Sequence, residues 1–365
     1  MLRYLLGGLL ALTSLVVRAQ PAPTADALVE QGLTLYAADK NNQALVYFQQ
    51  ALKLKPDDFR AQYGVALVYY TTGRYAESAA VCEQLVQRGD DRLPNLYVTY
   101  GTSLDRQHKS AEAVQVYQQA LRKFPADEPL WRYQGIALYS LKRYDEAAAS
   151  LQQAVRLLPG KPTTHLLLAQ AESARQHRIP ALLACLSGLM VVSSETQAHS
   201  ALNHLDQLLQ EGVQKTGVSK QGTTTVSVNL SPDLLNQLDQ PGSSPDNFAT
   251  TETALTLTTA ADYTAENKDK APVEHLQEKL TTVVESLAAQ PAAARRGFAW
   301  EYYAPFFIEL NQQGHTPTLA YLLEAMRPGT PLPDVSGWLR THPQQLQDFV
   351  RWRKAYQWPA APGGR

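Results

Sequence analysis

Residues 128–161 read EPLWRYQGIALYSLKRYDEAAASLQQAVRLLPGK, and this stretch decides the fold of the first half of the chain. Two segments with an apolar stripe flank the turn Leu141-Lys142-Arg143, and the second segment runs up to Pro159. Proline cannot continue a helix interior, so Pro159 ends that segment. The stretch therefore predicts two antiparallel helices joined by a short turn.

The same pattern occurs three more times upstream, at a period of 34 or 35 residues. The four units span 25–58, 59–93, 94–127 and 128–161. Their eighth positions are Gly32, Ala66, Gly101 and Gly135, their twentieth positions are Ala44, Ser78, Ala113 and Ala147, and their twenty-fourth positions are Phe48, Cys82, Tyr117 and Leu151. Small residues let two helices approach closely, and most of the twenty-fourth positions carry a large side chain that fills the remaining gap. No unit can bury its apolar stripe alone, so the units must stack into a solenoid.

The phase of these small, large and proline positions resembles the tetratricopeptide repeat family over residues 25–161. The resemblance implies an α-α solenoid whose first helices line a concave groove. It also implies that the groove binds a protein or peptide partner.

A fifth, degenerate unit is predicted from Pro162, with small residues at Ala169, Ala181, Cys185 and Gly188. Ser194 then reads as the N-cap of a closing helix that runs to Glu211 and stops at Gly212. We therefore expect a repeat solenoid with a capping helix over residues 20–212.

The chain has two cysteines, Cys82 and Cys185, at the same repeat position in the second and fifth units. Adjacent packed helices lie about 8–10 Å apart, so three repeats of separation exceed the roughly 7 Å Cα limit for a disulfide. Two buried, free thiols are predicted.

Residues 213–270 are rich in Thr and Ser and differ from the repeats. Two alternating runs, 223–230 and 252–259, predict two strands of a β-hairpin, with Pro241–Pro245 as a loop. A flexible linker is the alternative for this segment.

Helical signals return over residues 271–358. The expected helices are 272–289, 291–310, 318–326, 335–340 and 343–356. Four of the five Trp residues follow residue 299, and aromatic residues at helical spacing favour a buried core over a cofactor site. We predict a small aromatic-rich helical bundle, with residues 359–365 as a tail. This half loosely resembles the uncharacterised C-terminal regions of exported repeat proteins of the gram-negative envelope.

The first nineteen residues have the pattern of a secretory signal. Arg3 precedes an uncharged apolar run from Tyr4 to Val17, and Ala19 provides a small residue before a cut at Gln20. The run is shorter than the roughly 20 residues that span a bilayer. We expect export to the periplasm or the medium without stable membrane insertion. An uncleaved anchor is the alternative, because Arg18 is unusual beside a cleavage site.

The charge balance excludes one class of function. The 365 residues include 33 Lys and Arg and 34 Asp and Glu, which leaves no basic excess for nucleic-acid binding. His199 and His204, five residues apart on one predicted helix, point about 140° apart and do not form a metal pair. No phosphate loop or nucleophile elbow is present. We therefore expect no enzyme activity, cofactor or metal.

The resemblance points to candidate partner-binding residues on the inner face of the first four units. In the family, the second, fifth, ninth, twelfth and thirteenth positions line the groove. Here these positions yield ten candidates: Tyr36, Arg60, Tyr63, Tyr70, Asn95, Thr102, Asp105, Arg106, Arg132 and Tyr139. Grooves that grip a terminal carboxylate carry Lys and Asn where this chain has Val29 and Leu33, so that mode is not expected.

The leading hypothesis is a non-enzymatic interaction scaffold of the cell envelope that binds a peptide or partner segment in its concave groove. One alternative is a glycan-binding or hydrolytic module in the C-terminal half, with the repeats as its docking arm and an open aromatic cleft near Trp300 and Glu301. Another is a structural envelope protein whose groove tyrosines pack on each other or whose second half fills the groove. The oligomeric state is left open.

Overall fold

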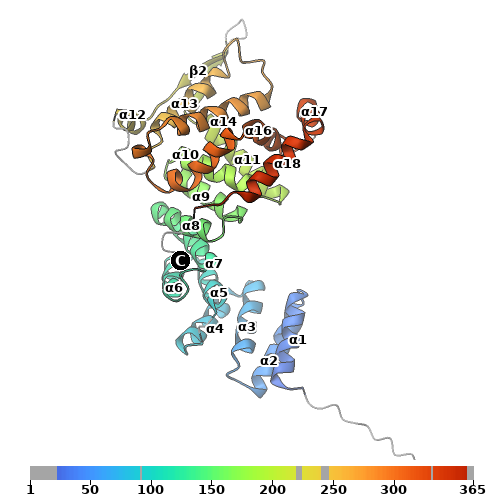
Figure 1. Ribbon diagram of the computed structural model, residues 1–365. Helices are drawn as coiled ribbons and strands as arrows, with labels where there is room; N and C mark the ends of the chain where they lie inside the picture. The colour runs from blue at the N-terminus through green and yellow to red at the C-terminus, as the bar shows by residue number, and fades with distance from the viewer. Residues whose placement is uncertain (1–22, 91–92, 219–223, 240–245, 330–331, 360–365) are drawn as a thin grey trace, which may run out of the picture. The chain divides into compact units, whose positions relative to one another are not determined.

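The computed structural model describes residues 23–90, 93–218, 224–239, 246–329 and 332–359 (Figure 1). These residues form α-helices almost throughout, together with one two-stranded antiparallel sheet, which confirms the predicted fold class. The predicted signal over 1–19, the loop 241–245 and residues 360–365 lie outside the described residues. The chain divides into two compact units, Met1–Asp90 and Asp91–Arg365.

The first unit contains two helix pairs. Its helices are α1 (Ala25–Ala37), α2 (Asn41–Leu54), α3 (Phe59–Thr71) and α4 (Tyr75–Gln87). Thr24 and Asp58 cap the first helix of each pair by accepting hydrogen bonds from the backbone N–H of Ala27 and Ala61. The ends of these helices are therefore determined locally, by the residues that close one repeat and open the next.

Phe48 explains the small residues of the first unit. Its ring is fully buried between α1 and α3. A Cβ added at Gly32 or at Gly64 would lie 2.6 Å from a ring carbon of Phe48. The two glycines therefore create the space that this phenylalanine fills, as the small and large positions of the repeat predict.

The second unit continues the repeat pattern. Its repeat helices are α5 (Pro94–Asp105), α6 (Ser110–Lys123), α7 (Glu128–Ser140), α8 (Tyr144–Leu157), α9 (Pro162–Ala174), α10 (Arg178–Leu189) and α11 (Glu195–Gln210). The pair α9 and α10 confirms a helix pair where the fifth unit is predicted. The closing helix α11 also forms as predicted, capped by Ser194 and followed by Gly212 at φ +81°.

All five helix pairs turn in the same way. The fifteenth residue of each of the five repeats has a positive φ, although only one of these five residues is glycine. These residues are Asp39, Gly73, His108, Lys142 and Gln176. Because the positive φ recurs at the fifteenth residue of the fifth repeat, this repeat keeps the backbone geometry of the others despite its degenerate sequence.

Both cysteines are buried and free, as predicted. Burial raises the pKa of each thiol to about 12. The two sulfurs therefore remain protonated and act as small apolar groups.

Residues 213–261 differ in part from the predicted hairpin. Strand β2 (Thr224–Val228) forms within the first predicted run, but its antiparallel partner is β1 (Val213–Val218). The second predicted run, 252–259, is wrong: it lies inside helix α13 (Ala249–Ala261), and a short helix α12 (Pro232–Asp239) precedes it.

Burial explains why the second run is helical. Thr251, Leu255 and Thr259 recur every four residues and are fully buried, whereas Leu257 is 55% exposed. Alternation would have placed Leu255 and Leu257 on one face of a strand, but the helix separates them. The threonine hydroxyls are satisfied either by carbonyls of their own helix, as at Thr253, or by neighbours such as Ser286.

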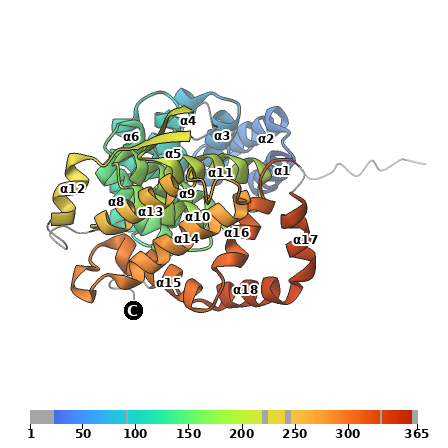
Figure 2. The ribbon, with the colours of Figure 1, turned by 90° about the horizontal axis from the view of Figure 1, so that it is seen from above.

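The C-terminal helices confirm the predicted bundle, with one correction. They are α14 (Pro272–Ala289), α15 (Ala304–Gln312), α16 (Thr316–Ala325), α17 (Pro333–Thr341) and α18 (Pro343–Ala355). Helices α13 and α14 run side by side (Figure 2). The predicted single helix over 291–310 is broken into a 3-10 turn (Ala292–Ala294), a π-helix (Ala299–Tyr303) and α15.

Asp246 accounts for the break before the π-helix. Its carboxylate accepts hydrogen bonds from the backbone N–H of Ala299 at 2.9 Å and Trp300 at 3.4 Å. Gly297 has a φ of +107°, and a Cβ there would lie 2.5 Å from the Asp246 carboxyl carbon. Burial raises the pKa of Asp246 to about 6. A residue some fifty positions upstream therefore caps the new helix and forces the chain to restart.

The aromatic residues of the C-terminal half form a core. Trp300, Tyr302, Tyr303, Phe306 and Phe307 are each at most 2% exposed. The ring of Trp358 stacks on Tyr302 and on Phe306, with centroids 5.0 and 4.8 Å apart. The open aromatic cleft that a glycan-binding module needs is therefore not present at Trp300.

Within the second unit, this core packs against the fifth repeat. Every residue of α10 is buried. His165 on α9 lies 2.7 Å from both the Pro159 carbonyl and the Tyr303 hydroxyl. Because a carbonyl only accepts, His165 Nε2–H donates to it, and Nδ1 accepts from Tyr303. Burial lowers the pKa of His165 to about 4, so the ring is neutral at pH 7.

Candidate functional site

The inner face of the second unit carries a hollow of about 670 Å³ between α7, α9 and α11. Its twelve lining residues are Tyr139, Thr163, Leu166, Leu167, Gln170, Ser173, Gln197, Ser200, Ala201, Asn203, His204 and Gln207. None of them comes from the C-terminal helices, so the described residues of the second half of the chain do not fill this part of the inner face.

The residues on α9 occupy the groove positions of the repeat. Counted from Pro162, Thr163, Leu166, Gln170 and Ser173 are the second, fifth, ninth and twelfth residues. Tyr139 is the twelfth residue of the fourth unit. The ten predicted residues all lie in the first four repeats, so these four were missed; the same counting applied to the fifth repeat would have found them.

Helix α11 repeats this spacing. Gln197, Ser200, His204 and Gln207 are separated by three, four and three residues, which places them on one face of the helix. The spacing on α9 is the same. Helix α11 therefore presents its side chains like the first helix of another repeat, and it extends the inner surface by one step.

The hollow is polar but carries no formal charge. Its lining contains four carboxamides and three aliphatic hydroxyls, and no Asp, Glu, Lys or Arg. Ser173 Oγ lies 2.8 Å from His204 Nε2. Burial lowers the pKa of His204, so its imidazole is neutral at pH 7. The surface can thus donate and accept hydrogen bonds, but its lining offers no opposite formal charge to a charged ligand.

The structure places four of the ten predicted residues on α1 and α3 of the first unit. Tyr36 and Tyr70 lie close enough to interact, and burial is the main cause of the raised pKa of Tyr36. Tyr70 also packs edge-on against Tyr75, with ring centroids 5.6 Å apart. Tyr63 stacks on Phe59 at 5.9 Å. The tyrosines are half-buried and leave part of each ring accessible.

Arg60, the fourth of these residues, forms an ion pair with Glu30 that joins α3 to α1. Its side chain is 49% exposed. An exposed pair of this kind adds little stability, so a partner can compete for the guanidinium at small cost.

The other six predicted residues lie in the second unit, and three of them are committed to internal contacts. Thr102 is buried and donates to the Val98 carbonyl at 2.7 Å. Asp105 accepts from the Ser110 hydroxyl at 2.5 Å. Arg132 is paired with the buried Glu128 at 2.9 Å and lies over the ring of Tyr133. These side chains serve the fold, and a partner would have to displace those contacts.

Asn95, Arg106 and Tyr139 are exposed. Of the ten predicted residues, Tyr139 lines the hollow described above. Its ring packs against Tyr144, with centroids 5.3 Å apart, which fixes its orientation at the edge of the hollow.

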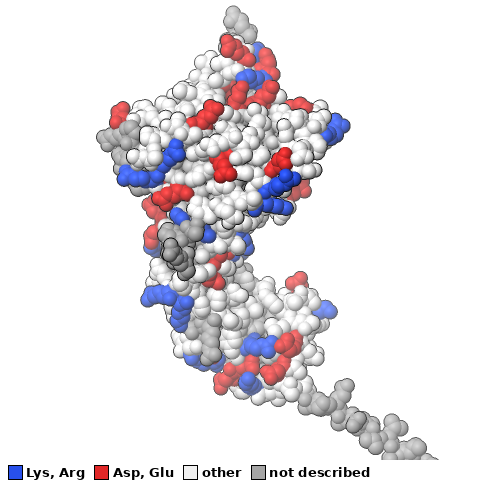
Figure 3. Space-filling view, in the orientation of Figure 1, with Lys and Arg blue, Asp and Glu red and all other residues white. Residues whose placement is uncertain are grey.

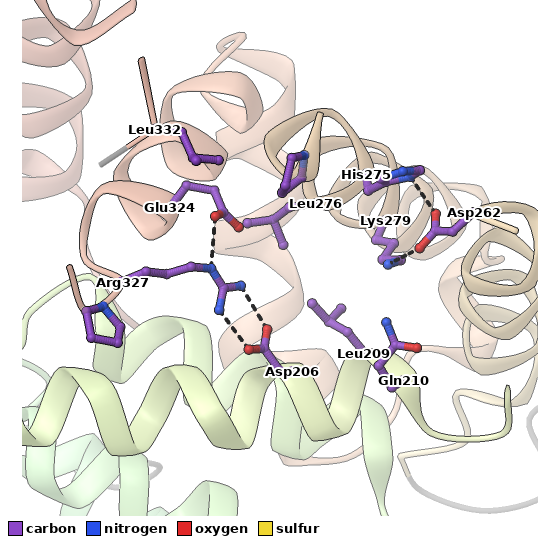
Figure 4. A pocket seen from close by; sticks show the side chains of 12 residues that line it. Asp206, Leu209, Gln210, Asp262, His275, Leu276, Lys279, Glu324, Arg327 and Leu332 are labelled. Atoms are coloured by element: carbon purple, nitrogen blue, oxygen red, sulfur yellow. Dashed lines mark hydrogen bonds and ion pairs between the residues drawn. The ribbon is translucent and has the colours of Figure 1, made fainter. Parts of the chain in front are cut away.

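A second hollow, of about 550 Å³, lies between α11, α14 and α16 (Figure 4). On one side Arg327 binds Asp206 at 2.7 and 2.8 Å and Glu324 at 2.9 Å. These hydrogen bonds raise the pKa of Arg327, and the bond to Asp206 contributes most.

On the other side of this second hollow, Asp262 lies 2.5 Å from Lys279 and 2.8 Å from His275. The charges of both sides are thus satisfied within the protein. The ion pairs around this second hollow connect the capping helix α11 to the C-terminal bundle and stabilise their packing.

Three general features of the described residues concern metal binding, membrane spanning and surface charge. They contain no group of three or more His, Cys, Asp or Glu side chains arranged to hold a metal ion. None of their helices is long and apolar enough to cross a membrane. On the face of the second unit drawn in Figure 3, acidic and basic side chains are interspersed, so no large patch of one sign is visible there.

Comparison with known protein families identifies the repeats. Residues 29–92 and 100–162 match the model of a tetratricopeptide repeat family. These segments of the chain are therefore tetratricopeptide repeats, as their period predicts, and such repeats form protein-interaction folds. No curated protein matches the chain.

Several solved structures, two of them described as tetratricopeptide repeat proteins, are similar to about half of the chain. One is a thermophilic repeat protein of Thermus thermophilus, 22% identical, covering 51% of this chain and 99% of its own, with a TM-score of 0.41. YrrB, whose structure was described as having an unusual peptide-binding site, is 19% identical over 51% and 93%, with a TM-score of 0.42. PilF of Pseudomonas aeruginosa is 18% identical over 51% and 89%, with a TM-score of 0.44.

Proposed function

We propose that this protein is a non-enzymatic interaction scaffold of the cell envelope that binds a peptide-like segment of a partner on the inner face of its repeats. The observation that carries the proposal is the open hollow on α7, α9 and α11, lined by residues at the groove positions of the repeat. Such a surface is concave and partly apolar, and its polar groups converge on the space inside.

Among the ten predicted residues, the accessible ones fit this role best. We assign partner contact to Tyr36, Arg60, Tyr63, Tyr70, Asn95, Arg106 and Tyr139. Half-buried tyrosines provide apolar contact area at a low entropy cost, and exposed arginines are frequent at binding hot spots. The hydrolytic or glycan-binding alternative loses its support because the aromatic rings near Glu301 are buried.

The binding proposal is tested with a library of random twelve-residue peptides displayed on phage and selected on the purified protein. Gln170→Ala combined with Asn203→Ala removes two exposed carboxamides from the hollow. We expect the selected peptides to bind this double variant at least about tenfold more weakly, a loss of about 1.4 kcal/mol. Fluorescence anisotropy with labelled peptides measures the change.

The matched control is Gln118→Ala combined with Gln119→Ala, two exposed carboxamides on α6 outside the hollow. Both double variants should melt at the wild-type temperature, since they change exposed side chains. If no peptide is selected, or if the selected peptides bind both double variants equally, the hollow is not the binding surface, and the proposal loses the observation that carries it.

Export is the second part of the proposal, and the N-terminal sequence pattern supports it. We expect the protein recovered from the native host to begin at Gln20 and to occur in the envelope or the medium. Mass spectrometry of the N-terminal peptide after cell fractionation checks this. A protein that keeps Met1 and remains in the cytosol would rule out the envelope assignment.

A further inference from the structure

We infer that the hollow on α7, α9 and α11 takes an uncharged peptide segment, held by its main chain, and rejects segments whose central side chains carry a charge. This inference rests on the proposed binding function and adds the class of ligand. It concerns the groove positions of α9 and α11, which lie beyond the ten predicted residues.

The first observation is the change in charge along the repeats. In the first four repeats, the groove positions include five charged residues: Asp26, Arg60, Asp105, Arg106 and Arg132. On α9 and α11 the corresponding positions are Thr163, Leu166, Gln170, Ser173, Gln197, Ser200, His204 and Gln207. The hollow is therefore a neutral end of an otherwise charged series.

Three charged residues that adjoin this lining in sequence, Glu172, Arg175 and Asp206, are paired with other side chains, whereas Glu195 at the start of α11 is 87% exposed. Glu172 is buried and paired with Arg175 at 2.7 Å. Asp206 is turned to the other side of α11, where it pairs with Arg327 (Figure 4). Arg175 also holds Asp145 at 2.7 Å. The charges of Glu172, Arg175 and Asp206 are therefore not free to pair with a charged ligand.

The second observation is the chemistry of the side chains that remain. A carboxamide donates and accepts hydrogen bonds at once, as the N–H and C=O groups of an extended peptide require. Gln170 and Asn203 are exposed on facing helices and can address the two edges of such a strand. They would bind the main chain of the ligand and place no demand on its charge.

The floor of the hollow adds an apolar seat. Leu166 and Leu167 are half-buried on α9, and Ala201 is 5% exposed on α11. Leu166 rests against Gly188 of α10, where an added Cβ would lie 2.6 Å from its side chain. An aliphatic side chain of the ligand fits against this floor, whereas a charged one would lose its hydration without gaining a partner.

The inference is tested by sequencing the peptides selected on phage and by measuring how their dissociation constants depend on salt. We expect the central positions of the selected peptides to lack Asp, Glu, Lys and Arg. Their dissociation constants should change less than about twofold between roughly 50 and 500 mM NaCl, because salt screens only charge pairs. Replacing the central aliphatic residue of a selected peptide with Lys should weaken binding at least about tenfold.

A charge placed in the hollow should reverse this preference. In the Gln170→Glu variant, the Lys-substituted peptide should bind at least about tenfold more tightly than it binds the wild type, because the new carboxylate pairs with the ammonium group. Gln119→Glu on α6 is the matched control and should leave both peptides at their wild-type affinities.

The outcomes separate the two proposals. Charged peptides that lose binding in the Gln170→Ala/Asn203→Ala variant would overturn the inference on ligand class while the binding function stands. Peptides of any composition that bind that variant unchanged would overturn both. Uncharged peptides whose binding is lost in the variant and insensitive to salt support both.

Discussion

Replacing Arg178 with leucine lowers the free energy of unfolding of the second unit by about 3–5 kcal/mol, the largest effect that we expect for a single polar side chain. Arg178 is 2% exposed at the start of α10. Its guanidinium donates to the carbonyls of Leu208 at 2.7 Å and Leu209 at 3.2 Å, and to the Thr256 hydroxyl at 2.7 Å. One side chain thus joins α10, the end of α11 and α13.

The effect is large because Arg178 caps the C-terminal end of helix α11. The last carbonyls of α11 have no partner in their own helix, and the negative end of the helix dipole lies there. Arg178 satisfies both, although burial lowers the pKa of its guanidinium. Without it, the Leu208 carbonyl is left buried and unpaired, and the leucine side chain does not fill the same volume.

Differential scanning calorimetry measures this effect. For a unit of this size we expect the melting temperature to fall by about 5–10 °C. Arg122→Leu, an exposed arginine on α6, is the control and should shift the melting temperature little. If the Arg178 and Arg122 variants melt together, the buried guanidinium does not hold the capping helix in place.

Phe48→Ala in the first unit should cost about 3–5 kcal/mol of unfolding free energy. The ring is fully buried, and the two glycines that accommodate it, Gly32 and Gly64, cannot move inward to fill the cavity because they have no side chains. The loss should therefore lie at the upper end for a phenylalanine in a core.

Hydrogen exchange locates this second effect. Amides of α1, α2 and α3 should lose protection, because the three helices share the core around Phe48. Val46→Ala, on the same helix but 49% exposed, is the control and should leave protection unchanged. Equal exchange in the two variants would mean that the twenty-fourth position does not organise the repeat.

The helix pairs of the repeat region were predictable because the residues that determine them lie within a single repeat. Gly32, Gly101 and Gly135 mark the close contacts between helices, and each lies against the large residue sixteen positions later in its own repeat. The hollow on α7, α9 and α11 was half predictable. Its spacing is present on α9 and α11, but its openness depends on the C-terminal helices packing elsewhere, and that is a matter of distant contacts.

The C-terminal half shows what local patterns cannot decide. The run 252–259 fits both a strand and a helix over its short length, and the burial of Thr251, Leu255 and Thr259 against other helices selects the helix. The break before the π-helix has a local mark in Gly297, but its partner, the Asp246 carboxylate, lies some fifty residues upstream, where no local pattern shows it.

The amino-acid sequence alone therefore determined the period, the helix pairs and the turns of the repeats, since each depends on residues within one unit. Three-dimensional packing decided which of the inner-face side chains remain accessible: Thr102 and Arg132 are committed to the fold, whereas Tyr139 and Gln170 face the hollow. Burial and pairing depend on segments far apart in the chain, and no local spacing encodes them.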